Sequence, residues 1–136
     1  MRGDGGRVMM KWKLAAVCLM ALLPVVGGCG KQSRVWQQAA AMTGGSPERG
    51  REKIRKYGCA ACHTIPGIPD ADALVGPPLT SMAARTYIAG VISNTPENMV
   101  RWIQNPPGVD DKTAMPNLGV TEQDARDISS YLYTLK

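Results

Sequence analysis

Two of the four cysteines and the single histidine of the chain stand together in the segment Cys59-Ala60-Ala61-Cys62-His63. The spacing C-x-x-C-H is the signature of covalent haem attachment, in which each thiol adds across one haem vinyl group and the adjacent imidazole coordinates the iron. The alternatives are a thioredoxin-like redox pair, half of a zinc site and a structural disulfide. The redox pair needs a surrounding βαβ pattern, which the sequence lacks. The zinc site needs two more ligands, and Cys29 is the only other cysteine or histidine beyond the leader, so the zinc site is disfavoured. The motif predicts one haem c, attached through Cys59 and Cys62, with His63 as an iron ligand.

Beyond this motif, the chain resembles the class I cytochromes c over essentially all of residues 46–136. The segment Gly76-Pro77-Pro78-Leu79 is similar to the Gly-Pro-x-Leu loop of that family. This likeness implies that the Pro77 carbonyl accepts a hydrogen bond from the second ring nitrogen of His63 and so fixes the imidazole. Met115, followed by a proline, is similar to the sixth ligand of the family, and its soft, neutral thioether would favour ferrous iron. Met82 is the next candidate for that ligand.

Three further positions carry weaker likenesses to the family. Arg85 stands six residues after Leu79, where mitochondrial cytochrome c has the arginine that neutralises a haem propionate, and a solvated surface charge is the alternative. Trp102 falls where the family has an aromatic residue beside the axial methionine, and it can also be a plain core tryptophan. Thr113 matches a threonine near a propionate, with a surface hydroxyl as the alternative.

The first 28 residues have the pattern of an export signal. Four basic side chains and one acidic side chain precede an apolar run of 13 residues, 14–26. A membrane anchor is the alternative, but spanning a bilayer takes about 20 apolar residues. The following Val25-Val26-Gly27-Gly28-Cys29 resembles a bacterial lipobox, which implies that Cys29 is acylated, and an ordinary signal-peptidase site is the other interpretation. We predict a signal peptide over 1–28, which starts at Met1, Met9 or Met10.

Charge and composition narrow the function further. The leader accounts for +3 of the formal net charge of +5, so the exported protein is nearly balanced and nucleic-acid binding is disfavoured. Within it, residues 30–58 hold seven basic and two acidic side chains, which is typical either of a solvated surface near anionic lipids or of a docking surface for an acidic partner. Aromatic residues make up only 5% of the chain, so a haem would supply the large flat hydrophobe that the core lacks.

Helix signals place these residues in a mostly α domain. Ser46-Pro47, Thr95-Pro96 and Thr121 are typical helix starts, and long loops at 64–81 and 105–120 lie between the expected helices. The resemblance implies that the first and last helices cross where Gly50 meets Tyr131, although the spacing from Gly50 to the haem motif is one residue longer than in mitochondrial cytochrome c. We expect a lipidated N-terminus and linker over 29–45, with a possible short helix inside it, and a class I cytochrome c domain of three to five helices over 46–136.

The resemblance implies a carrier of single electrons rather than an enzyme, with no small-molecule substrate. It would be exported and lipid-anchored, with its haem domain on the periplasmic or outer face of the cytoplasmic membrane. The segments around Thr95 and Met115 are similar to cytochrome c domains associated with terminal oxidases, which suggests electron delivery from a quinol-oxidising complex to such an oxidase. A haem-based gas sensor and an electron-transfer subunit of a dehydrogenase or reductase are the alternatives.

Overall fold

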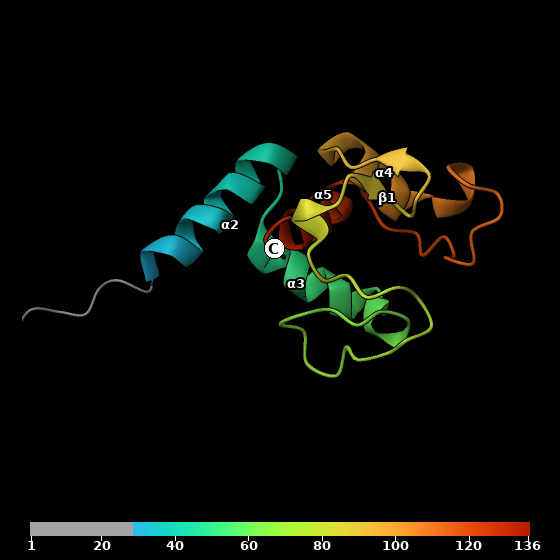
Figure 1. The fold of residues 1–136 in the computed structure, drawn as a ribbon, viewed down its shortest axis with the longest axis horizontal. Helices are drawn as coiled ribbons and strands as arrows, with labels where there is room; N and C mark the ends of the chain where they lie inside the picture. Colours follow the sequence, from blue (N-terminus) through green and yellow to red (C-terminus); the bar gives the residue numbers. More distant parts are fainter. Residues whose placement is uncertain (1–28) are drawn as a thin grey trace, which may run out of the picture. The chain divides into compact units, whose positions relative to one another are not determined.

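The computed structural model describes residues 29–136, and the predicted leader over residues 1–28 lies outside the described residues. From Gln32 onward the chain forms one compact unit. The elements are, in chain order, α2 (Cys29–Thr43), α3 (Pro47–Lys56), the 3₁₀ helices η1 (Cys59–Ala61) and η2 (Met82–Ala84), β1 (Tyr87–Ile88), β2 (Ile92–Ser93), α4 (Pro96–Gln104), η3 (Pro106–Gly108) and α5 (Glu122–Leu132) (Figure 1). The prediction of a mostly α domain with three to five helices and long loops is confirmed. Among residues 29–136, no helix combines the length and the hydrophobicity needed to cross a bilayer.

Helices α3, α4 and α5 begin where the sequence predicts. In each, a hydroxyl oxygen before the helix accepts a hydrogen bond from the backbone N–H three residues later, at 3.2–3.3 Å, and the caps are Ser46, Thr95 and Thr121. These bonds satisfy backbone donors that the first helical turn leaves without a partner. Prolines follow two of the caps, at the first helical position, where no intrahelical donor is lost.

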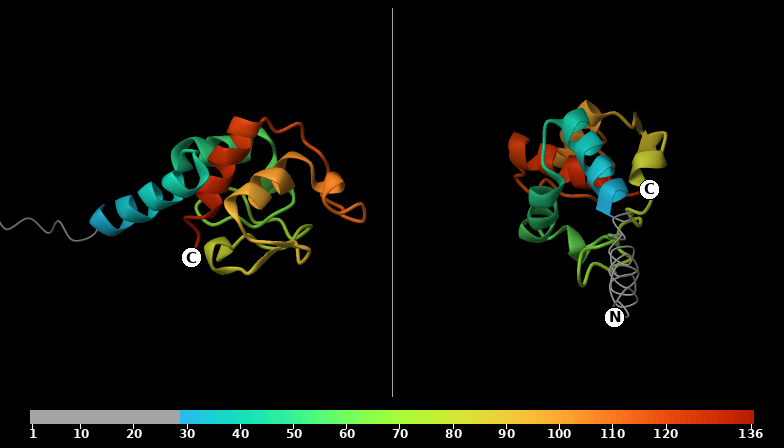
Figure 2. Two further views of the ribbon diagram at one scale, coloured as in Figure 1. Left: turned by 90° about the horizontal axis from the view of Figure 1, so that it is seen from above. Right: turned by 90° about the vertical axis from the view of Figure 1, so that its left-hand side faces the viewer.

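Helices α3 and α5 cross at Gly50, as the family resemblance implies. A β-carbon at Gly50 would lie 2.0 Å from the carbonyl oxygen of Asp127 and 3.0 Å from the β-carbon of Tyr131. The backbones approach so closely that no larger residue fits without displacing one helix. Figure 2 shows α5 running against α3, and α5 also packs against α4. The predicted first-to-last helix crossing is confirmed.

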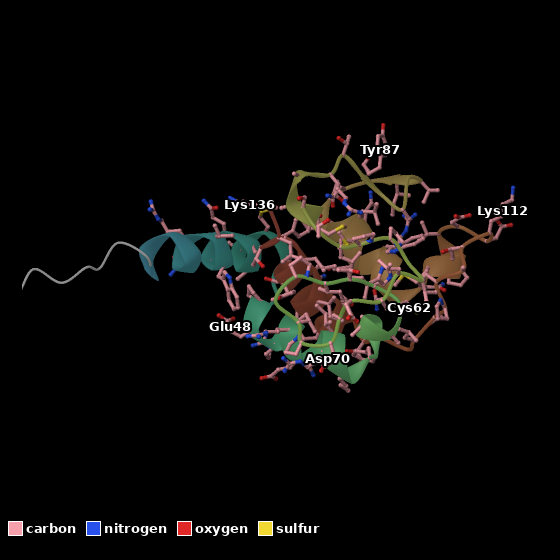
Figure 3. The ribbon with its side chains drawn as sticks, turned by 60° about the horizontal axis from the view of Figure 1, so that its bottom comes forward. Glu48, Cys62, Asp70, Tyr87, Lys112 and Lys136 are labelled. Atoms are coloured by element: carbon pink, nitrogen blue, oxygen red, sulfur yellow. The ribbon has the colours of Figure 1, made fainter. Side chains whose placement is uncertain are left out.

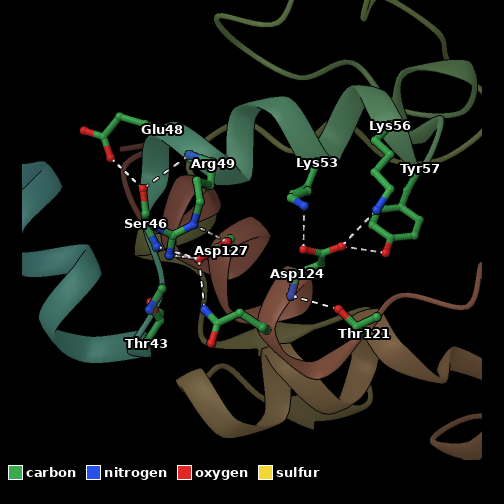
Figure 4. Close-up of polar contacts among 12 residues, drawn as sticks. Thr43, Ser46, Glu48, Arg49, Lys53, Lys56, Tyr57, Thr121, Asp124 and Asp127 are labelled. Atoms are coloured by element: carbon green, nitrogen blue, oxygen red, sulfur yellow. Dashed lines mark hydrogen bonds and ion pairs between the residues drawn. The ribbon is translucent and has the colours of Figure 1, made fainter.

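Two aspartates of α5 also bind polar side chains of α3 on either side of this crossing (Figure 4). Asp124 is ion-paired to Lys53 at 2.8 Å and to Lys56 at 3.3 Å, and it accepts a hydrogen bond from the Tyr57 hydroxyl at 2.7 Å. The hydrogen bonds from Lys53 and Tyr57 hold the pKa of Asp124 well below its usual range. Asp124 thus remains a carboxylate and ties the C-terminal half of α3 to the start of α5.

Asp127, which is 1% exposed, does the same for the N-terminal half of α3. Its carboxylate accepts two hydrogen bonds from the Arg49 guanidinium and one from the Ser46 backbone N–H, all at 2.8 Å. Burial alone would raise the pKa of Asp127, but these donors and Gln123 outweigh burial and lower it. Three of the basic side chains of α3 are therefore engaged within the fold, which leaves less of the basic segment for docking an acidic partner than the composition suggests.

The segment expected to be a linker is largely helical. Helix α2 runs to Thr43, and only three residues connect it to α3. Trp36 meets the ring of Tyr131 edge-on at 6.3 Å between centroids, while Ala39 and Thr43 are each 2% exposed. The aromatic pair and the burial of the small residues fix this helix on α5. The short helix considered for the middle of the linker thus extends over the whole segment and packs on the domain.

The remaining chain forms loops and one short hairpin, in which each strand has two residues. Strands β1 and β2 pair antiparallel, with Tyr87 opposite Ser93, a feature that no sequence pattern predicted. The buried core gathers side chains from α2, α3, α4, α5 and the segment between η1 and β2, and its largest members include Ile54, Ile65, Met99, Trp102 and Tyr131. Methionine and aliphatic side chains thus do most of the packing that aromatic residues do in other small domains.

Candidate haem-binding site

The cysteine motif lies in a tight turn directly after α3. The 3₁₀ helix η1 starts at Cys59, and the backbone N–H groups of Cys62 and His63 both donate to the Cys59 carbonyl, at 3.2 and 3.1 Å. Both cysteines are partly buried and free. Burial raises the pKa of the Cys59 thiol. The turn therefore carries two free thiols, with the imidazole of His63 immediately after the second.

His63 is held by the loop that the resemblance assigns to it. Its Nδ1 lies 2.7 Å from the Pro77 carbonyl oxygen. Because a carbonyl oxygen can only accept, Nδ1 is the donor in this bond, and Nε2 is the ring nitrogen left to bind a metal. A β-carbon at Gly76 would lie 2.4 Å from Cε1 of His63, so glycine is required where the loop passes the ring. The ring is thus oriented by a hydrogen bond on one edge and by backbone packing beside it.

Backbone hydrogen bonds fasten both ends of this loop to the haem motif. The Gly76 N–H donates to the Cys62 carbonyl at 2.7 Å, and the Leu79 N–H donates to the Thr64 carbonyl at 2.8 Å. The motif and the loop, 14 residues apart at His63 and Pro77, therefore form one local unit.

Arg85 lies beside the same loop. Its Nη2 donates to the carbonyl oxygens of Pro78 and Thr80, the latter at 2.9 Å. A fully solvated surface charge, one of the two interpretations of this residue, is therefore not what the structure shows. Both bonds leave from one nitrogen, so the guanidinium keeps other N–H donors for an anion such as a propionate.

Met115 lies in the loop that precedes α5. It is partly buried against the core, and its backbone N–H donates to the Thr113 hydroxyl at 3.2 Å. Trp102, on α4, is 8% exposed and belongs to that core. Met82 and Met99 are buried at 4% and 1% exposure, as packing methionines are. In Figure 3, Cys62 lies toward the end of the molecule where the loop around Lys112 is found, away from Glu48.

The residues present fit a covalently bound haem. Two free thiols lie on one turn, an imidazole next to them has its Nδ1 engaged, and a thioether stands in a loop with no helix or strand to constrain it. This is the donor set of a c-type haem with histidine and methionine ligands. Within residues 29–136 no group of three or more His, Cys, Asp or Glu side chains is placed to hold a metal ion.

Comparisons with known proteins bear on this site. The family model described as cytochrome c matches residues 47–136. The chain belongs to the cytochrome c family. Members of this family bind haem covalently through cysteines, and Cys59 and Cys62 are the two cysteines of the matched region. The protein is therefore a c-type cytochrome whose haem transfers electrons.

One curated relative is an oxidase subunit by its name. The chain is 32% identical over 89 residues to "Cytochrome c oxidase subunit 2" of Alkalihalophilus pseudofirmus. The match covers 65% of this chain, which spans a quarter of the length of that relative. No solved structure matches the chain significantly.

Sequence reasoning missed two residues near the site, Asn94 and Tyr133. The side chain of Asn94 donates to the carbonyl oxygens of Met82 and Arg85, and it accepts from the hydroxyl of Tyr133. An asparagine before Thr95-Pro96 reads as part of a helix start, and nothing in the local pattern points to partners 9 to 39 residues away.

Proposed function

We propose that the protein is a membrane-tethered carrier that accepts one electron at a time and delivers it to a terminal oxidase. The observation that carries the proposal is the fixed imidazole of His63, whose Nδ1 is bound to the Pro77 carbonyl and whose Nε2 is left for the iron of a haem attached beside it. The haem, when bound, supplies an iron that alternates between the ferrous and ferric states.

The protein residues would hold the iron without rearranging between the two states. His63 and Met115 are the residues proposed to bind it, with Trp102 beside Met115. The Pro77 bond and the Gly76 contact prevent the imidazole from rotating, so little has to move when the charge of the iron changes. The free N–H donors of Arg85 and the Thr113 hydroxyl are proposed to face the propionates, whose charge they would offset.

The proposed partners are a quinol-oxidising complex as donor and a terminal oxidase as acceptor. Support comes from the likeness to a cytochrome c oxidase subunit 2, within which a domain of this kind is one quarter of the chain. A domain of the same kind would serve electron transfer to an oxidase here as well.

The proposed tether is the acylated Cys29, which is the first residue of α2. Two or more acyl chains are needed for stable membrane anchoring. Because α2 packs on α5 through Trp36, the tether would join a structured helix and not a free chain.

The test is respiration of membranes from a strain that lacks the protein. We expect oxygen consumption with a quinol substrate to fall, to recover with the wild-type chain, and to stay low with Met115→Ala. Cys29→Ala, exported by a cleavable signal, should restore it only when the protein is supplied in excess. Unchanged oxygen consumption in the deleted strain would contradict delivery to an oxidase.

A spectroscopic control separates the carrier from a gas sensor. A carrier with two protein ligands should resist carbon monoxide in its reduced form, because the sixth position is filled. Rapid carbon monoxide binding by the reduced wild type, at the same rate as by Met115→Ala, would contradict methionine ligation and favour the sensor.

A further inference from the structure

Between the backbone bonds at Gly76 and Leu79, the loop that fixes His63 depends on side-chain donors. Pro77 and Pro78 have no backbone N–H, so they can only accept hydrogen bonds. Their carbonyls need donors from elsewhere. His63 supplies one to Pro77, and Arg85 supplies the other to Pro78 and reaches on to Thr80. Arg85 is thus the side-chain donor that fixes the Pro78 carbonyl, next to Pro77, in addition to the backbone bonds at Gly76 and Leu79.

Asn94 fixes the segment of backbone from which the Arg85 side chain extends. Its Nδ2 donates to the carbonyl oxygens of Met82 and Arg85, both at 2.8 Å, and so closes the turn of η2 at its two ends. The Asn94 backbone N–H donates to the Thr86 carbonyl at 2.9 Å. Three bonds from one residue therefore hold the segment from Met82 to Thr86 against the start of α4.

Tyr133, at the end of α5, orients the Asn94 amide. Its hydroxyl donates to Oδ1 of Asn94 at 2.7 Å, which turns Nδ2 toward the two carbonyls. Tyr133 is 7% exposed. Burial, and then the charge of Glu97, raises the pKa of Tyr133 to about 12, so the hydroxyl keeps its proton and remains a donor throughout the physiological range.

We propose that Asn94 is a positioning residue for the axial histidine, acting through Arg85 on the loop that carries the Pro77 carbonyl. The inference rests on the proposed ligation of the haem iron by His63. A hydrogen bond from Nδ1 to a carbonyl makes the imidazole a stronger electron donor and stabilises ferric iron. Loosening Arg85 weakens that bond, and the reduction potential rises.

The test compares haem-loaded Asn94→Ala with the wild type in two measurements. Solvent exchange of the His63 Nδ1 proton, followed by NMR in the reduced protein, should become about tenfold faster, since local opening of the loop exposes this bond. The midpoint potential should rise. Tyr133→Phe, which keeps the ring and removes the hydroxyl that orients the amide, should shift both quantities in the same direction by less.

Asn98→Ala is the matched control. Asn98 lies on α4, and its Nδ2 donates to the Ser93 carbonyl at 3.0 Å, away from the loop. It should leave exchange and potential at wild-type values. Arg85→Ala should speed the exchange at least as much as Asn94→Ala, and the double variant should add nothing to Arg85→Ala, because the two residues act in series.

Two outcomes overturn the inference. One is an Asn94→Ala protein whose exchange rate and potential equal those of Asn98→Ala, and the other is full additivity with Arg85→Ala. If Asn94→Ala does not fold, the test rests on Tyr133→Phe. A wild-type exchange rate and a wild-type midpoint potential in Tyr133→Phe would then overturn the proposal. A wild-type spectrum without histidine ligation would instead refute the proposed function, which keeps the two failures distinguishable.

Discussion

The helix crossing and the haem loops of this protein are held together in opposite ways. Where α3 meets α5, the two helices touch directly at Gly50, and the carboxylates of Asp124 and Asp127 bind side chains of the facing helix. In the loops, side chains of His63 and Arg85 donate to carbonyls of a proline-rich segment. The first region is a packed interface of two helices. The second contains no helix or strand and is held by two backbone bonds, at Gly76 and Leu79, together with these side-chain donors.

The largest effect is expected on the loop side, from loss of both thiols. In Cys59→Ala/Cys62→Ala no thioether can form, so haem should be lost completely under denaturing conditions. Haem staining after denaturing electrophoresis measures this, and haem that remains bound to the double variant would contradict attachment at these residues.

The crossing should break next, by substitution of its glycine. In Gly50→Ala the new β-carbon would lie 2.0 Å from a backbone oxygen of α5, and we expect the free energy of unfolding to fall by about 3 kcal/mol. Urea unfolding of the haem-loaded protein measures it.

Gly119→Ala controls for the glycine substitution itself. Gly119 has a φ of +67° and nothing within 4 Å of an added β-carbon, so only backbone strain of about 1 kcal/mol applies. Equal losses at the two positions would show that close helix approach is not what Gly50 provides.

Acid should weaken the crossing selectively. The pKa of Asp124 is lower in the folded protein than the 3.8 of an unperturbed aspartate, so its contribution to stability is complete above about pH 5 and is lost progressively as the pH falls through the unfolded pKa toward the folded one. We expect the free energy of unfolding to decrease between pH 5 and pH 3, and to decrease less in Asp124→Asn. Parallel pH profiles for the two proteins would contradict this role.

The smallest effect concerns α2. Trp36→Ala removes the edge-on contact with Tyr131 and should lower the free energy of unfolding by about 1 kcal/mol. Gln37→Ala, on an exposed position of the same helix, should change it by less than about 0.5 kcal/mol. Equal values for both variants would mean that α2 does not stabilise the domain.

The same contrast explains what the sequence could predict. The helix starts at Ser46, Thr95 and Thr121 could be predicted because the capping residues are neighbours in sequence. The bond from His63 to Pro77 could be predicted from two short motifs of a known family. The docking of α2 could not be predicted, because Gln and Ala residues suit a solvated helix as well as a packed one. Asn94 escaped prediction because its role depends on carbonyls and a hydroxyl that only the folded chain brings near it.

The most direct test of the account is a redox titration of the haem-loaded protein, followed through the far-red absorption band that methionine gives to ferric haem. We predict a single one-electron transition, with the band present in the oxidised wild type. In Met115→Ala the band should be absent and the midpoint potential lower. A band that persists in Met115→Ala, or a wild type that lacks it, would contradict the proposed ligation and with it the carrier mechanism.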